Sequence, residues 1–261
     1  MSELIRTAAE IDVWGTILYV EVASTSVGES ELNVGIDELK TFVHKVDAIF
    51  SPFKSDSEVS RIRRKEISIE AASPEMQEIW QLCLRAKELT NGAFDPWAVK
   101  KGFDPSGYVK GWAADRCIEI LRKLGAEHIQ INAAGDLSLF GGSEPGKPWS
   151  IGVRDPENKF KVVKVFEIQS GAIATSGQYE IGAHIINPRD GMVAIGAASA
   201  TVMGPDGGLA DALATALMVD GKDGAALFMQ PELKEYSAWV IERESGTGRV
   251  SDQAWSIPLE R

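Results

Sequence analysis

Gly204-Pro205-Asp206-Gly207-Gly208-Leu209-Ala210-Asp211-Ala212-Leu213-Ala214-Thr215 is a glycine-led turn that opens into a helix, expected to run from about Leu209 to Val219. Asp211 and Thr215 are four residues apart, so their oxygens project from one helical face and could reach one hard cation. Such oxygens suit Mg²⁺ or Ca²⁺ rather than Zn²⁺. The structural alternative is that Asp211 favours the helix macrodipole and Thr215 bonds back to a carbonyl.

A second glycine-led turn, Gly102-Phe103-Asp104-Pro105-Ser106-Gly107-Tyr108-Val109-Lys110-Gly111, also leads into a helix. Free N–H groups at a helix start and the Lys110 ammonium favour a phosphate, while outward carbonyls could bind a metal. The alternative is an ordinary capped helix with an exposed lysine. The segment lacks Walker spacing, and no Gly-x-Gly-x-x-Gly follows a strand, which argues against P-loop and Rossmann sites. Together the two turns indicate phosphoryl-transfer chemistry.

The rest of the chain interleaves strands and helices without a regular βαβ order, which predicts an α+β fold with mixed sheets and packed helices. No linker divides it, so residues 1–261 are expected to form a single unit. Residues 57–62 read as a polar turn and residues 67–69 as β-prone; Gly15 reads as a close-approach point in the first strand. The other expected helices cover 32–49, 74–89 and 108–124, and the expected strands cover 13–22, 128–132, 137–140, 150–153, 162–168, 171–175, 184–186, 197–202 and 236–242.

Composition restricts the partners and the compartment. The formal charge of −11 disfavours nucleic acid and anionic membranes as partners. The N-terminal segment has no basic start followed by an apolar stretch, and no other stretch approaches the length of a membrane span. Cys83 and Cys117 have no partner motif, which predicts reduced, buried thiols. We therefore expect a cytoplasmic protein without stable membrane insertion.

Three further features are ambiguous when taken singly. Phe94 and Asp95 follow a helix stop, where a ring beside a carboxylate could hold a planar ligand, or Phe94 could simply lie in the core. His184 precedes an apolar pair, where it could act as a base or be a satisfied core residue. Asp136 ends a strand in small residues and could be an acid or a turn carboxylate, of which the turn role is favoured.

Read in order, these segments resemble the ApbE family, flavin transferases that move FMN from FAD onto a protein threonine or serine. The matching motifs are Trp14-Gly15-Thr16, Phe50-Ser51-Pro52-Phe53, Ser57-Glu58-Val59-Ser60-Arg61, Gly92-Ala93-Phe94-Asp95-Pro96, Lys110-Gly111-Trp112-Ala113-Ala114-Asp115, Asn132-Ala133-Ala134-Gly135-Asp136, Ala174-Thr175-Ser176-Gly177, His184-Ile185-Ile186-Asn187-Pro188-Arg189-Asp190-Gly191 and Ala210-Asp211-Ala212-Leu213-Ala214-Thr215-Ala216.

The resemblance implies an ApbE-like, T-fold-related architecture with two interlocked lobes around a flavin cleft. It implies that Mg²⁺ is bound by the Gly107 carbonyl, Asp211 and Thr215, so Asp211 becomes a catalytic candidate through the metal. His184 becomes the candidate base, because an attacking hydroxyl needs a proton acceptor. The FAD-lining positions implied are Trp14, Phe53, Ala93, Phe94, Asp95, Asp104, Lys110 and Ile186.

Four positions depart from the family's pattern. Trp14 replaces Met and Phe53 replaces Tyr, which keeps an apolar or aromatic surface but loses a phenol. Ala134 replaces a glycine and adds a methyl group, and Asn187 replaces an Asp and removes a charge beside His184. Three functions are therefore open: a Mg²⁺-dependent FMN transferase acting on an acceptor protein, a FAD hydrolase, or a FAD-binding protein whose chemistry has decayed.

Overall fold

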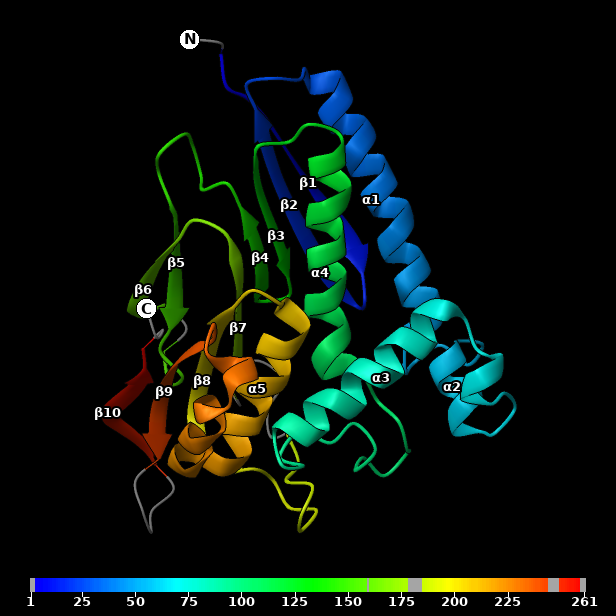
Figure 1. Ribbon diagram of the computed structural model, residues 1–261, viewed down its shortest axis with the longest axis vertical. Coiled ribbons are helices and arrows are strands. Elements are labelled where there is room, and N and C mark those ends of the chain that lie inside the picture. The colour runs from blue at the N-terminus through cyan, green and yellow to red at the C-terminus, as the bar shows by residue number, and fades with distance from the viewer. Residues whose placement is uncertain (1–2, 159, 178–184, 244–248, 259–261) are drawn as a thin grey trace.

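The computed structural model describes residues 3–158, 160–177, 185–243 and 249–258, and its centre is one large sheet (Figure 1). Eight strands lie in the order β1-β2-β3-β4-β7-β8-β9-β10, and each neighbouring pair is antiparallel. The predicted α+β class is confirmed, but the sheet is antiparallel rather than mixed. The strands are β1 (Ile5–Val13), β2 (Thr16–Ser24), β3 (His128–Ala133), β4 (Asp136–Phe140), β7 (Gly171–Gly177), β8 (Ala197–Gly204), β9 (Ser237–Arg243) and β10 (Val250–Ile257).

Helices cover one face of this sheet, and a two-stranded ribbon packs on part of the other. On β4, Ser138 points to α4 while its neighbours Leu137 and Leu139 pack against the ribbon, as strand alternation requires. Two main hydrophobic clusters lie under the helices, one around α1 and β1–β3 and the other around α3, α5 and β7–β9. The ribbon is β5 (Trp149–Arg154) with β6 (Val162–Ile168), and the α-helices are α1 (Glu29–Phe50), α2 (Glu58–Arg63), α3 (Pro74–Leu89), α4 (Ser106–Lys123) and α5 (Gly207–Asp220). A 3₁₀ turn at 69–71 lies between α2 and α3, and two more at 221–229 and 231–233 lie between α5 and β9.

Local signals located most elements correctly. Ser73 caps α3 by accepting from the Met76 N–H, Pro74 is its first residue, and Asn91 and Gly92 end the segment with positive φ. Cys83 and Cys117 are free and buried, as predicted.

Several local predictions are wrong. The strand expected over 13–22 is broken by a two-residue hairpin turn, in which Trp14 and Gly15 have φ of 58° and 73°. Gly15 is therefore needed for its backbone conformation and not for close approach, since the space beside it is open. Residues 58–63 are helical because Ser57 caps them, and 67–69 pair with no strand. In the expected strand 184–186, His184 lies outside the described residues and Ile186 forms only an isolated bridge to Val193.

Helices α4 and α5 cross in close contact at Gly111 and Gly207. A Cβ at Gly111 would lie 2.2 Å from the carbonyl carbon and oxygen of Gly207, so only glycine permits this approach. The Asp115 carboxylate strengthens the contact by accepting hydrogen bonds from the Gly207 N–H at 2.7 Å and from Ser138 Oγ at 2.6 Å. One carboxylate thus joins α4, the start of α5 and β4.

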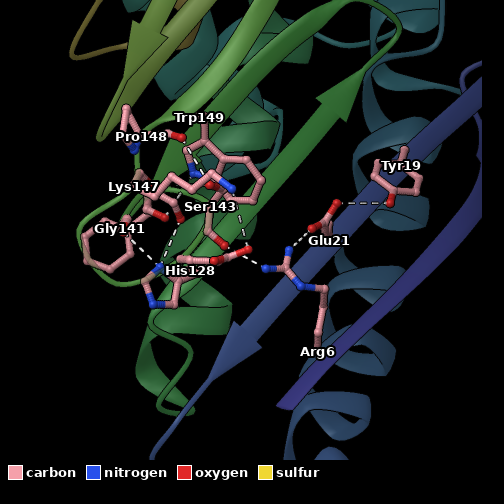
Figure 2. Close-up of polar contacts among 12 residues, drawn as sticks. Arg6, Tyr19, Glu21, His128, Gly141, Ser143, Lys147, Pro148 and Trp149 are labelled. Atoms are coloured by element: carbon pink, nitrogen blue, oxygen red, sulfur yellow. Dashed lines mark hydrogen bonds and ion pairs between the residues drawn. The ribbon is translucent and has the colours of Figure 1, made fainter. Parts of the chain in front are cut away.

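Polar contacts also connect strands β1, β2 and β3 to the loop after β4 (Figure 2). Arg6 donates to Glu21 and, at 2.7 Å, to the Ser143 carbonyl, which connects β1 and β2 to the loop after β4. The Nδ1 atom of His128 lies 2.8 Å and 3.0 Å from the carbonyl oxygens of Gly141 and Gly142. Because carbonyls only accept, this nitrogen carries the hydrogen, and His128 has a structural role.

We expect Gly111→Ala to destabilise the fold by about 3 kcal/mol, because the new methyl meets backbone that cannot rotate away. Gly35→Ala in α1 is the matched control, since its new methyl meets only the flexible ends of Leu121 and Leu124. Urea unfolding measures both. Equal losses of unfolding free energy in the two variants would contradict the role assigned to this crossing.

Asp115 predicts a pH dependence of stability. Burial is the largest cause that raises the pKa of Asp115 to about 7, against the opposing hydrogen bonds from Ser138 and Gly207. A carboxyl with a raised folded pKa binds its proton more tightly in the folded chain, so its stabilising contribution is lost as pH rises from about 4 to about 7. Between pH 5 and pH 8 the parent protein should lose about 1–3 kcal/mol relative to Asp115→Asn. Urea unfolding at both pH values should show it; a pH-independent difference would contradict it.

Candidate active site

A cavity of about 990 Å³ lies where the hairpins β1–β2 and β3–β4 turn. Both turns have two residues, Trp14-Gly15 and Ala134-Gly135, and all four have positive φ. Because Leu18 pairs with Ala133, the two turns lie at the same edge of the sheet. For Trp14 and Ala134 the left-handed conformation is unfavourable, by about 1–2 kcal/mol each. The cavity edge is therefore made of strained backbone, as functional sites often are.

The structure brings the predicted site residues to this one cavity. Its walls come from the two hairpin turns, the end of α1, the loop before α4, the first turn of α4, the end of β7 and one face of α5. His184 lies outside the described residues. The predicted residues that line the cavity are Trp14, Phe53, Ala93, Phe94, Asp95, Asp104, Gly107, Lys110, Ile186, Asp211 and Thr215.

Three of these residues meet where α4 faces α5. Asp211 is buried, and within the described chain its Oδ2 atom has no hydrogen-bond partner. Thr215 lies one turn later with its hydroxyl 3.4 Å from Ser176 Oγ. Gly107 lies at a kink of α4 with ψ of 19°, and a Cβ there would lie 3.7 Å from Thr215 Oγ1. A lone buried carboxylate oxygen beside a hydroxyl and a kinked backbone fits a hard cation.

The charges around Asp211 are arranged by a neighbouring ion pair. Lys110 Nζ donates to Asp136 Oδ2 at 2.9 Å, and Asp136 is almost completely buried. Burial raises the pKa of Asp211, the negative charge of Asp136 raises it further, and the Lys110 ammonium lowers it. Asp136, interpreted from sequence as a turn carboxylate, is therefore part of the site's electrostatics.

Hydrogen bonds and ion pairs within the protein fix the side of the cavity that contains Phe94, Asp95 and Asp104. Phe94 is buried, and its N–H donates to Thr90 Oγ1 at 3.1 Å, so the core role weighed for it holds. Asp95 pairs with Lys87 at 2.7 Å and Asp104 pairs with Arg63 at 2.9 Å. These two carboxylates are thus oriented by the protein before any ligand arrives.

The two aromatic substitutions differ sharply in environment. Phe53 is 92% exposed and projects into solvent at the cavity. The indole of Trp14 is half-buried, and its Nε1–H has no hydrogen-bond acceptor among the described residues. An indole N–H normally finds an acceptor when it is buried, so a ligand atom in the cavity could supply one.

Sequence reasoning missed two charged lining residues, Asp47 and Arg154. Asp47 sits in the last turns of α1 and pairs with Lys54. Arg154 ends β5, the strand that follows β4 in the chain. No local pattern distinguishes either from a surface charge, because only the packing of α1 and the ribbon brings them to the cavity.

The ApbE family model matches residues 14–100 and 97–240, which is most of the chain. The chain belongs to the ApbE family. Members of this family named FAD:protein FMN transferase are similar to it in sequence. The one from Rhodobacter capsulatus is 34% identical over 129 residues, and the one from Haemophilus influenzae is 32% identical over 133. These matches cover 46% and 47% of this chain but only 24% and 38% of the relatives' own lengths.

Longer matches have lower identity. The FAD:protein FMN transferase from Chlamydia pneumoniae is 24% identical over 263 residues, covering 78% of this chain and 82% of that protein. Among solved ApbE structures, the flavin transferase ApbE from Vibrio cholerae superimposes with a TM-score of 0.81 at 21% identity, covering 98% of this chain and 97% of that one. The Thermotoga maritima ApbE protein gives 0.78 at 24% identity, covering 91% and 94%. These structures show that the ApbE fold is shared.

Replacement by Asn should change the free energy of unfolding in opposite directions at Asp211 and at Asp136. In the metal-free protein at pH 9, above the pKa of about 8 to which burial and Asp136 raise it, Asp211 is ionised. There Asp211→Asn removes a buried charge without a described partner and should raise the free energy of unfolding by about 1 kcal/mol or more. Asp136→Asn weakens the pairing of Lys110 and should lower it by about 1 kcal/mol. Urea unfolding in the presence of a chelator measures both. A loss of stability in Asp211→Asn would contradict the uncompensated state of this carboxylate.

Proposed function

We propose that this protein transfers FMN from FAD to a threonine or serine hydroxyl of an acceptor protein, with Mg²⁺ as cofactor and AMP as the leaving product. The observation that carries the proposal is the buried, unpartnered Asp211 oxygen beside Thr215 and Gly107, in a cavity with Lys110 and aromatic side chains. Family membership and the names of the relatives support the same reaction. The expected cytoplasmic location stays a prediction; none of the helices in the described ranges combines the length and apolar character of a membrane span.

The donor set favours Mg²⁺ over a metal held by the protein alone. Within the described residues no group of three or more His, Cys, Asp or Glu side chains could hold a metal. Mg²⁺ is commonly bound by one or two carboxylates together with substrate phosphates, which matches a single carboxylate, a hydroxyl and a backbone carbonyl. When bound, it would supply charge neutralisation at the diphosphate.

The chain's own groups account for binding and orientation. Trp14, Phe53 and Phe94 offer apolar and aromatic surface for the flavin, and Lys110, oriented by Asp136, offers a cation for a phosphate oxygen. In the transfer, the acceptor oxygen bonds to the FMN phosphorus and the bond from that phosphorus to the bridging oxygen breaks. AMP leaves with the electron pair. The hydroxyl proton goes to a base, for which His184 is the sequence-based candidate.

The test combines FAD, MgCl₂ and candidate acceptor proteins with the purified enzyme. We expect flavin fluorescence on the acceptor in a denaturing gel, a mass gain of one FMN, and equal amounts of AMP. Asp211→Asn should lower the rate by about 100-fold or more, because the main metal ligand is lost. A variant of this kind with full activity would remove the metal assignment. AMP release without acceptor labelling would establish the hydrolase instead, and intact bound FAD under all conditions would establish a decayed site.

A further inference from the structure

The charged groups that line the cavity differ in whether the protein already pairs them. Asp47, Asp95, Asp104 and Asp136 each have a lysine or arginine partner in the chain. Two lining charges have no ion pair or hydrogen bond within the described residues. One is the buried Asp211, and the other is Arg154, which is exposed to solvent at the cavity. An uncommitted guanidinium is a binding group for an oxyanion.

The ribbon places Arg154 at the cavity edge. Trp149, at the start of β5, donates its indole N–H to the Phe140 carbonyl at 3.4 Å, which sets this end of the ribbon beside the last residue of β4. Along β5, the chain from Trp149 to Arg154 extends about 16 Å. Along β4, the distance from Phe140 back to Asp136 is about 13 Å. Arg154 therefore extends to the sheet edge where Asp136 meets Lys110.

The turn after Arg154 holds the residue in place without neutralising it. The Asp155 carboxylate accepts from the N–H groups of Glu157 and Asn158 and pairs with Lys161 at 2.9 Å. The nearest carboxylate in sequence is thus committed to its own turn. Arg154 keeps its positive charge available on a fixed backbone.

We propose that Arg154 binds the phosphate of the AMP half of FAD and stabilises it as it leaves. The inference rests on the proposed transfer reaction. When the bridging oxygen takes the electron pair from the breaking bond, the AMP phosphate changes from a diester-like group with one charge to a terminal phosphate with nearly two. A guanidinium fork at that position gains interaction energy as the charge develops. Arg154 is then a substrate-binding residue that acts with, but separately from, Lys110.

The test uses Arg154→Gln and Arg154→Lys, with Lys164→Gln as the matched control. Lys164 lies on the same ribbon, over the Phe166 ring at 5.6 Å, and does not line the cavity, so its loss changes the net charge equally. Calorimetry measures AMP affinity, fluorescence quenching measures riboflavin affinity, and steady-state kinetics measures the KM for FAD and for the acceptor. We expect Arg154→Gln to weaken AMP binding about 10- to 100-fold, with riboflavin affinity unchanged. Arg154→Lys should recover part of the loss, because a point charge replaces the fork.

Four results would count against the role of Arg154 or against the proposed function. AMP affinity that falls equally in Arg154→Gln and Lys164→Gln would reduce the effect to net charge and overturn the inference. A rise in the KM for the acceptor alone, with AMP and FAD binding unchanged, would assign Arg154 to an acceptor carboxylate and also overturn it. If the parent protein binds neither FAD nor AMP, the proposed function fails together with the inference. If it transfers FMN while Arg154→Gln matches the parent, only the inference fails.

Discussion

The contact between α4 and α5 at Gly111 and Gly207 is the constraint on which the site depends. Two helix backbones can approach this closely only because neither residue carries a side chain. The Asp115 carboxylate then satisfies the first N–H of α5 and joins it to β4 through Ser138. One residue before Gly111 is Lys110, and one turn after Gly207 is Asp211. This crossing therefore also brings Lys110 and Asp211, the groups proposed to bind a phosphate and a cation, into one cavity.

Glycine and left-handed backbone also occur at the cavity edge, because two tight hairpin turns lie there. The two neighbouring hairpins end in two-residue turns, and this tight closure leaves room for a ligand beyond the sheet. Trp14 and Ala134 have a left-handed backbone conformation that glycine adopts more easily, so the site contains backbone strain. Ala134, where the family resemblance leads us to expect glycine, is half-buried in a turn that lines the cavity, so its methyl group lies outside the packed interior.

The charged groups of the cavity are of two kinds: some are paired within the protein, and others are available to a ligand. Asp95 and Asp104 are tied to Lys87 and Arg63, so they orient loops. Asp211 has a carboxylate oxygen that the described chain does not satisfy, and its burial makes that state costly without a ligand. A site that carries uncompensated charge gives up stability that bound cation and substrate can restore.

Local signals in the sequence, namely helical periodicity, caps and ordered motifs, were enough to predict the α+β class, the long helices and most of the residues of the cavity. The sequence did not determine the hairpin at Trp14 and Gly15, since alternation alone cannot distinguish one long strand from two joined by a tight turn. Only the tertiary structure decided that Asp136 pairs with Lys110 and that Arg154 reaches the same cavity. Those placements depend on strand order and on the packing of the ribbon, which join segments far apart in the chain and leave no local pattern.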